Sequence, residues 1–139
     1  MRSAEQILRE TKTIALIGAS PNPGRPSHGV MRYLLAQGYR VIPVRPLDVE
    51  QVLGIPVVAS LADIAEPIDL VDVFRREEAA PGHAQEAVEA GVKAFWLQLD
   101  LRSPEARRIA TGAGLDYIED QCTAVVHRRM ESVNRGAQI

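Results

Sequence analysis

The segment that most constrains the fold is an apolar run followed by a glycine-rich loop and an amphipathic run. Residues 13–17 are all apolar except the first, and residues 18–29 hold three glycines and three prolines. Apolar residues then recur at helical spacing. This order predicts a β-strand, a loop, and an α-helix that Ser27 caps and Gly38 ends. In open α/β sheets such a turn presents backbone N–H groups and a helix N-terminus to a ligand, which predicts a phosphate site.

Strand-like and helix-like segments alternate along the rest of the chain. Besides the first strand, the pattern predicts strands at residues 39–44, 57–58, 68–74, 94–99 and 117–119. Helical segments are predicted at residues 1–10, 60–64 and 81–91, and from Ser103-Pro104-Glu105 onward. Residues 45–55 and 75–80 are expected to be loops, and residues after Met130 lack a pattern and are expected to fray.

Such alternation indicates right-handed crossovers between parallel strands, with helices on both faces of the sheet. The predicted fold class is therefore α/β: a three-layer, doubly wound parallel sheet of Rossmann-like type. We expect one domain over residues 1–139, with its core at about residues 11–130.

Composition excludes several classes of function. The chain has 16 basic and 18 acidic residues and a net charge of −2, so no general field attracts nucleic acid or an anionic membrane. Its single cysteine, Cys122, allows neither an internal disulfide nor a thiolate zinc cluster. The N-terminus lacks the apolar core of a signal peptide, and no run has the length of a membrane span. We expect a cytoplasmic protein without nucleic-acid or membrane partners.

In a doubly wound sheet, ligands bind beyond the carboxyl ends of the strands. The predicted strands deliver to that edge Gly18 to Ser20, Arg45, Phe74 to Arg76, Gln98, and Asp120 to Cys122. This set combines amides and cations, which suit phosphates, with an aromatic side chain for a flat ring. Phe74 ends its strand and is the better stacking candidate, whereas Trp96 lies inside a strand and is expected in the core.

The loop does not match the dinucleotide fingerprint, because Ser20 and Pro23 stand where G-x-G-x-x-G requires glycine. Arg45 follows the second strand, where NAD-binding domains place an acidic residue. A cation there favours a phosphorylated ribose, which leaves both NADP and coenzyme A (CoA) open. Arg25, Ser27 and the helix N–H groups can grip one phosphate, or the two side chains can simply decorate and cap the helix.

No catalytic or metal-binding constellation stands out. The three histidines, His28, His83 and His127, lack metal-ligand spacing. Neither a Walker lysine nor a nucleophile elbow is present. Asp120 and His127 are acid–base candidates only if the fold brings them to a substrate. The sequence predicts no catalytic residue and no metal.

Five segments together resemble a known family. They are Gly18-Ala19-Ser20 with Arg25-Pro26-Ser27, residues 71–76, residues 94–99, Asp120-Gln121-Cys122 and His127-Arg128-Arg129. In combination they are similar to the small stand-alone CoA-binding proteins. The single domain of those proteins resembles the CoA-binding domain of succinyl-CoA synthetase α subunits and of ADP-forming acyl-CoA synthetases. The resemblance covers roughly residues 11 to 130.

The resemblance implies a Rossmann-like domain that binds CoA or an acyl-CoA. By position, it implies phosphate contacts from Gly18, Ala19, Ser20, Arg25 and Ser27, and an adenosine site flanked by Arg45 and Pro46 and lined by Val73, Phe74 and Arg75. Two positions depart from the family. The family commonly has Asn where this chain has Arg45, and glycine where it has Asp100.

The larger synthetases use a phosphorylated histidine carried outside this domain, so the resemblance implies binding without catalysis. The protein would then be a carrier, a sensor or a partner subunit. Two alternatives remain: an NADP-linked small oxidoreductase, and an interaction module with a vestigial nucleotide pocket. A further hypothesis places Cys122 beside the ligand, where it forms a mixed disulfide with the CoA thiol; the alternative is a small buried residue.

Overall fold

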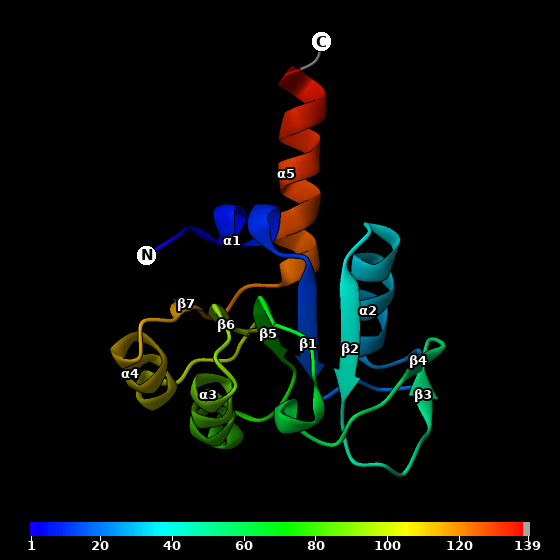
Figure 1. Ribbon diagram of the computed structural model, residues 1–139. Coiled ribbons are helices and arrows are strands. Elements are labelled where there is room, and N and C mark those ends of the chain that lie inside the picture. Colours follow the sequence, from blue (N-terminus) through cyan, green and yellow to red (C-terminus); the bar gives the residue numbers. More distant parts are fainter. Residues whose placement is uncertain (138–139) are drawn as a thin grey trace.

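In the computed structural model, which describes residues 1–137, five strands form one parallel sheet (Figure 1). They are β1 (Thr13–Ile17), β2 (Arg40–Val44), β5 (Leu70–Val73), β6 (Ala94–Leu97) and β7 (Asp116–Ile118), in the order β2-β1-β5-β6-β7. The chain builds outward from β1 first to β2 and then, on the other side, to β5. The order therefore reverses between β1 and β5, which is the switch point where doubly wound sheets open a crevice.

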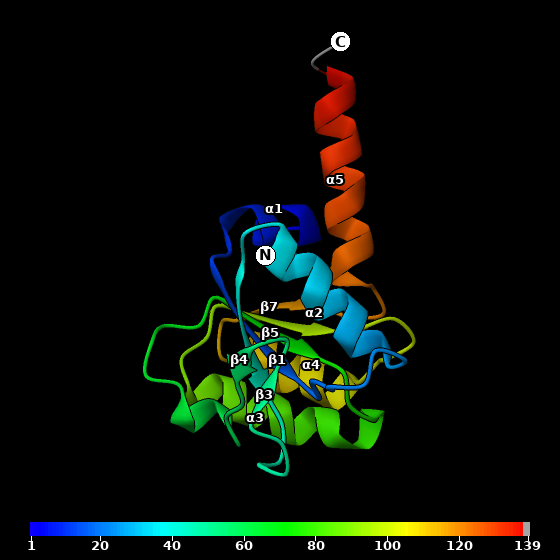
Figure 2. The same ribbon diagram turned by 90° about the vertical axis from the view of Figure 1, so that its right-hand side faces the viewer.

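Helices cover both faces of the sheet (Figure 2). On one face lie α1 (Ala4–Glu10), α2 (Pro26–Ala36) and α5 (Thr123–Ala137), and on the other lie α3 (Ala80–Glu89) and α4 (Pro104–Gly112). In β1, Ile14 and Leu16 pack toward the first group and Ala15 and Ile17 toward the second. Because both faces are covered, the strand has no solvent side and its sequence shows no polar alternation. The predicted fold class is confirmed.

The predicted helix cap at Ser27 was wrong. Helix α2 begins at Pro26 with Arg25 at the N-cap, and Ser27 lies inside the first turn with 4% of its surface exposed. Proline favours the first helical position because its φ suits the helix and it has no N–H to satisfy. The helix therefore starts two residues earlier than a cap at Ser27 would place it. The predicted helix end is correct, since Gly38 follows α2 with a φ of +98°.

The region between β2 and β5 also differs from the prediction. The strand expected at residues 57–58 is only a single bridge from Val58 to Val44. Instead, β3 (Gln51–Val52) and β4 (Ile55–Pro56) form an antiparallel hairpin inside the segment expected to be mostly loop. Both turn residues, Leu53 and Gly54, have positive φ, as in the tight turns that suit a twisted hairpin. Leucine is rare in such a turn, so no residue pattern predicted this hairpin.

The largest correction concerns the last helix. Residues after Met130 were expected to fray, but α5 runs from Thr123 to Ala137, and its second half projects beyond the rest of the molecule (Figures 1 and 2). Val126 and Met130 anchor its first half against the sheet. Beyond them residues 132–135 are exposed, Val133 by 70%, so this stretch has no buried stripe whose periodicity would have predicted a helix. No helix within residues 1–137 is long and apolar enough to cross a membrane.

Several strands and turns begin or end a few residues from their predicted bounds. Strand β5 lacks the flanking residues 68, 69 and 74 that the prediction included, and β6 ends at Leu97. The predicted loop at 75–80 holds a 3₁₀ turn, Glu77–Ala79, and a second such turn, Leu61–Asp63, lies in the helical segment predicted at 60–64. These shifts leave the carboxyl edge of the sheet where the sequence placed it.

Candidate ligand-binding cleft

The turn after β1 forms the first wall of a cleft at the carboxyl edge. Gly18 has a φ of +88°, and a Cβ atom built on it would lie 2.3 Å from the carbonyl oxygen of Phe74. Glycine is required here, because both the backbone conformation and the close approach of the next loop exclude a side chain. The turns after β1 and β5 therefore lie against each other at the switch point.

The rest of this loop is held by its own polar groups. The Ser20 hydroxyl accepts a hydrogen bond from the Asn22 N–H at 3.1 Å, and the Asn22 side chain accepts one from the Gly24 N–H at 2.9 Å. His28 Nδ1 lies 2.9 Å from the Ser20 carbonyl and ties the loop to α2. Within residues 1–137, the N–H groups of Ala19 and Ser20 have no backbone acceptor. A fixed loop thus offers free donors beside a helix N-terminus, which suits an anion.

Four arginines surround the cleft. Arg25 lies at the N-cap of α2, Arg45 follows β2, and Arg75 and Arg76 follow β5. Among the described residues, no carboxylate lies within ion-pair distance of Arg25, Arg75 or Arg76, and all three are exposed. Unpaired guanidinium groups in one cleft give a local positive field that the overall charge of −2 conceals.

Arg45 is held differently. Its Nη1 donates to the carbonyl oxygen of Ala19 at 2.9 Å, and its Nη2 lies 3.0 Å from Oδ1 of Asp48. Only 18% of the Arg45 side chain is exposed, against 64% for Asp48. Arg45 therefore joins the turn after β1 to the turn after β2, and it already has a carboxylate partner.

A buried carboxylate lies next to the floor of the cleft. Asp72, in β5, has no exposed surface and accepts hydrogen bonds from the side-chain amide of Gln98 and, at 2.9 Å, from the hydroxyl of Thr123. Burial raises the pKa of Asp72 to about 7, although both hydrogen bonds act in the opposite direction. Gln98 lines the cleft and Thr123 begins α5. This network fixes the end of β6 to the start of α5.

The cleft has a volume of about 1090 Å³ and brings together nine of the ten residues predicted to bind a ligand. They are Gly18, Ala19, Ser20, Arg25, Ser27, Arg45, Pro46, Phe74 and Arg75. Val73 is not among them. It is fully buried on the α3 side of the sheet, because even the last residue of a central, doubly covered strand points toward a helix. Contact of the other nine with a ligand stays a prediction.

A comparison with protein-family models decides the family. Residues 12–128 match the model described as "CoA binding domain". The chain belongs to this CoA-binding domain family. The matched region runs from just before β1 into α5, so it includes every residue of the cleft. The resemblance drawn from the sequence is confirmed.

Relatives of known sequence or structure agree with this placement. The chain is 41% identical over 123 residues to the uncharacterized protein YneT of Bacillus subtilis, covering 88% of this chain and 90% of YneT. A hypothetical protein from Pyrococcus horikoshii OT3 has 37% identity and a TM-score of 0.87, with 92% of each chain covered. The dinucleotide-forming acetyl-coenzyme A synthetase 1 of Ca. Korarchaeum cryptofilum shares the fold, at 22% identity and a TM-score of 0.71. That match covers 84% of this chain and 27% of the synthetase.

Several lining residues were absent from the predicted site. Asn22, Val30, Leu99 and Leu101 line the cleft, and Asp100 lies among them with a φ of +72°. The family's usual glycine at the Asp100 position suits this left-handed conformation. A glycine in relatives was thus a signal of a turn at the cleft. The other four lie within or next to the predicted loop and strand, where pattern alone does not show which way a side chain points.

Two strand-end residues named from the sequence also reach the cleft. Cys122 is partly exposed and lines it, as does Arg76. The mixed disulfide between Cys122 and the CoA thiol stays a prediction. Trp96 lies in the core as expected and donates to the carbonyl oxygen of Gln121 at 2.7 Å. Across residues 1–137, no three His, Cys, Asp or Glu side chains are grouped so as to hold a metal ion.

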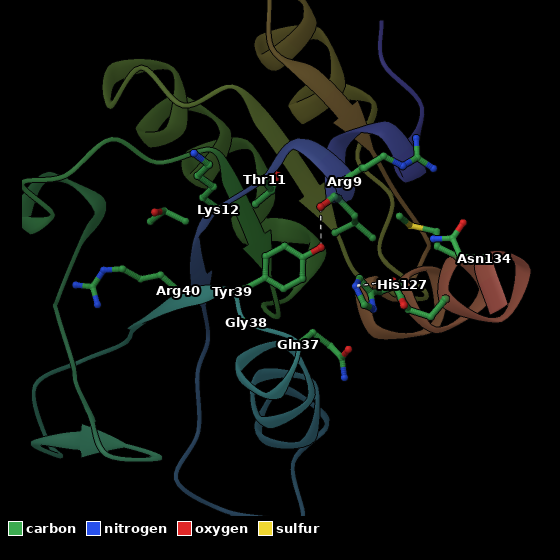
Figure 3. Close-up of a pocket in the computed structure, with 13 residues that line it drawn as sticks. Arg9, Thr11, Lys12, Gln37, Gly38, Tyr39, Arg40, His127 and Asn134 are labelled. Atoms are coloured by element: carbon green, nitrogen blue, oxygen red, sulfur yellow. Dashed lines mark hydrogen bonds and ion pairs between the residues drawn. The ribbon is translucent and has the colours of Figure 1, made fainter. Parts of the chain in front are cut away.

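A second hollow, of about 690 Å³, lies at the opposite end of β1 (Figure 3). At its centre the Tyr39 hydroxyl donates to the carbonyl oxygen of Leu8 at 2.7 Å. His127 Nδ1 lies 2.8 Å from the Tyr33 hydroxyl, and both tyrosine rings meet the imidazole edge-on. These contacts join α1, α2 and α5. None of the ten predicted site residues lines this hollow.

Proposed function

We propose that this domain binds CoA or an acyl-CoA in the cleft at the carboxyl edge of the sheet, without catalysis. The observation that carries the proposal is the meeting of nine predicted residues around one cleft whose arginines 25, 75 and 76 have no acid partner among the described residues. Membership of the CoA-binding domain family supports the same ligand class.

The chemistry of the cleft suits the charge of this ligand. CoA carries roughly four negative charges near neutral pH, since each phosphate monoester adds up to two. The free N–H groups of Ala19 and Ser20, the N-terminus of α2 and the exposed guanidinium of Arg25 all lie along one side of the cleft. We assign the diphosphate to this side. Hydrogen bonds from arginine to phosphate are charge-assisted and therefore strong.

The adenosine is assigned to the end of the cleft between Arg45-Pro46 and Phe74-Arg75. Phe74 is partly buried and follows β5 directly, so its ring can cover one face of adenine. Arg45 follows β2, where it can meet a ribose phosphate. The pantetheine arm then extends toward Gln98 and Cys122, at the opposite end of the cleft.

A binding role without catalysis makes the domain a carrier, a sensor or a partner subunit, as in the synthetases whose CoA-binding domain the sequence resembles. The single cysteine allows no internal disulfide and favours a reducing compartment, so we place the protein in the cytoplasm. A protein partner fits this role, and its identity is left to experiment.

Calorimetric titration of the protein with CoA, dephospho-CoA, NADP and NAD tests the proposal. We expect CoA to bind, and Arg45→Ala to weaken it, because the substitution removes a cation and unties two turns of the cleft. Arg32→Ala is the matched control: Arg32 is exposed on α2 and lines neither hollow. Heat from NADP alone would indicate an oxidoreductase. No heat from any of the four ligands would favour an interaction module with a vestigial pocket.

A further inference from the structure

Arg45 and Asp48 form a pair that the proposed CoA site does not by itself explain. Among the four arginines of the cleft, Arg45 is the one that the structure pairs with a carboxylate within residues 1–137. Arg45 also stands where the family that the sequence resembles commonly has asparagine. The carboxylate of Asp48 therefore offsets part of the positive charge that Arg45 brings to the proposed ribose site.

The distances between Arg45 and Asp48 show which edge of the guanidinium the carboxylate occupies. Arg45 Nη2 lies 3.0 Å from Oδ1 and 3.2 Å from Oδ2 of Asp48, and Nε lies 3.3 Å from Oδ1. The remaining edge donates from Nη1 to the carbonyl oxygen of Ala19. The carboxylate therefore takes the Nε–Nη2 edge, which is the edge a phosphate would bind through two parallel hydrogen bonds.

We propose that Asp48 is a specificity-determining residue that competes with the ribose 3′-phosphate of CoA for Arg45. The inference rests on the proposed function, and it deepens that function by naming what sets the preference between CoA and dephospho-CoA. A 3′-phosphate reaches the Nε–Nη2 edge only after the carboxylate leaves it. An unphosphorylated ribose requires no such exchange.

The surroundings of Asp48 allow this exchange. Its side chain is 64% exposed and lies in a turn, so it can swing into water without breaking other hydrogen bonds of its carboxylate within the described residues. Arg45 stays in place because its contact with Ala19 does not involve Asp48. Asp48 thus neutralises part of the Arg45 charge and subtracts from the affinity gained through the phosphate.

The test uses Asp48→Asn, which removes the charge and keeps the shape. The matched control is Glu50→Gln, which makes the same change of net charge two residues away at an exposed side chain. CoA and dephospho-CoA are titrated by calorimetry into the parent, both single variants, Arg45→Ala and the Arg45→Ala/Asp48→Asn pair. Thermal unfolding of each variant confirms that the fold is kept.

We expect Asp48→Asn to tighten CoA binding by about three- to tenfold, the size of one partly exposed ion pair. Dephospho-CoA affinity should change less than about twofold in Asp48→Asn, as should the affinity of Glu50→Gln for both ligands. In the Arg45→Ala background, Asp48→Asn should have no such effect. An unchanged or weakened CoA affinity in Asp48→Asn overturns the inference, as does an equal gain for both ligands.

Failure of the proposed function has a separate signature. If neither ligand binds the parent or any variant, the CoA site itself is wrong and the inference falls with it. If CoA binds the parent but Asp48→Asn does not shift the preference between the two ligands, only the role of Asp48 is wrong.

Discussion

The two hollows at opposite ends of β1 differ in how their polar groups are used. At the amino end, the Tyr39 hydroxyl is hydrogen-bonded to the carbonyl oxygen of Leu8 in α1 (Figure 3). His127 is hydrogen-bonded to the hydroxyl of Tyr33 in α2. Arg9 and Lys12 stand at the rim of that hollow and point in opposite directions (Figure 3). At the carboxyl end, several cations lie around one space without acid partners among the described residues.

This difference indicates that the hollow at the amino end stabilises the fold, whereas the cleft at the carboxyl end is suited to bind a ligand. A hollow whose central polar groups satisfy one another contributes to holding its elements together, since each internal hydrogen bond stabilises the fold modestly. Several unpaired like charges in one cleft lower the stability of the fold because they repel one another, and a bound anion offsets this repulsion. We therefore expect substitutions at the amino end to change the free energy of unfolding, and substitutions of the cleft arginines to change ligand affinity.

The largest effect should come from filling the turn at Gly18. In Gly18→Val the new side chain must occupy a φ of +88° and displace the Phe74 carbonyl, which would lie 2.3 Å from its Cβ. We expect the free energy of unfolding to fall by about 3 kcal/mol, measured by urea denaturation, and the cleft to lose its ligand.

Gly29→Ala is the matched control for this change. Gly29 lies within α2, and a Cβ atom there meets nothing within 4 Å. Replacing a helical glycine with alanine should raise the free energy of unfolding by up to about 1 kcal/mol. A loss of equal size in both variants would show that the close contact at Gly18 is not what fixes the turn.

The next effect concerns pH and the carboxylate beside the cleft floor. The pKa of Asp72 is raised from 3.8 to about 7 in the folded protein. Between these values the folded state holds a proton that the unfolded state releases, so stability falls as pH rises and levels off above about pH 7. From pH 5 to pH 8 we expect a loss of about 2–3 kcal/mol in the free energy of unfolding, from urea denaturation.

Asp72→Asn should remove most of this slope, because the amide does not titrate. Desolvation acts to raise the pKa of Asp69, but hydrogen bonds from the Thr13 and Lys12 N–H groups lower it below its usual value. Asp69 therefore changes stability with the opposite sign, and its effect on the free energy of unfolding lies below about pH 4. The window above pH 5 therefore separates the effect of Asp72 from that of Asp69. An equal slope in the parent and in Asp72→Asn would mean that Asp72 stays ionised throughout this window.

The carboxyl end was more predictable from sequence than the amino end, for physical reasons. Residues at strand ends are fixed by topology: once the strands that precede Gly18, Arg45 and Phe74 are parallel, their carboxyl ends must meet at one edge. The hollow around His127 depends on how α5 packs on α1 and α2, and that packing follows from few buried residues, chiefly Val126 and Met130. No local pattern announces such a contact between helices distant in sequence.

Within the cleft, sequence predicted which backbone turns converge but not the partners of the side chains. Arg45 was correctly placed at the edge, yet its pairing with Asp48 depends on the turn geometry set by Pro46 and the hairpin that follows. The burial of Val73 on the α3 side was not predictable, because a strand's last residue points to one face or the other, and only the register of β5 against its neighbours decides which. Turn chemistry and register are tertiary facts that a single sequence reports weakly.

The smallest effects give the sharpest test of the comparison, because two variants should move two different measurements. Arg25→Ala should weaken CoA binding by about five- to tenfold and change the free energy of unfolding by less than about 0.5 kcal/mol, since Arg25 is exposed and unpaired among the described residues. Tyr33→Phe removes the hydroxyl that meets His127 Nδ1 and should lower the free energy of unfolding by about 1 kcal/mol with CoA affinity unchanged. Calorimetry and urea denaturation of both variants, with Arg32→Ala as the charge control on α2, give the full set. If Tyr33→Phe weakens CoA binding as much as Arg25→Ala does, the two ends of β1 are energetically coupled. The assignment of stability to the amino end and of ligand binding to the carboxyl end would then be wrong.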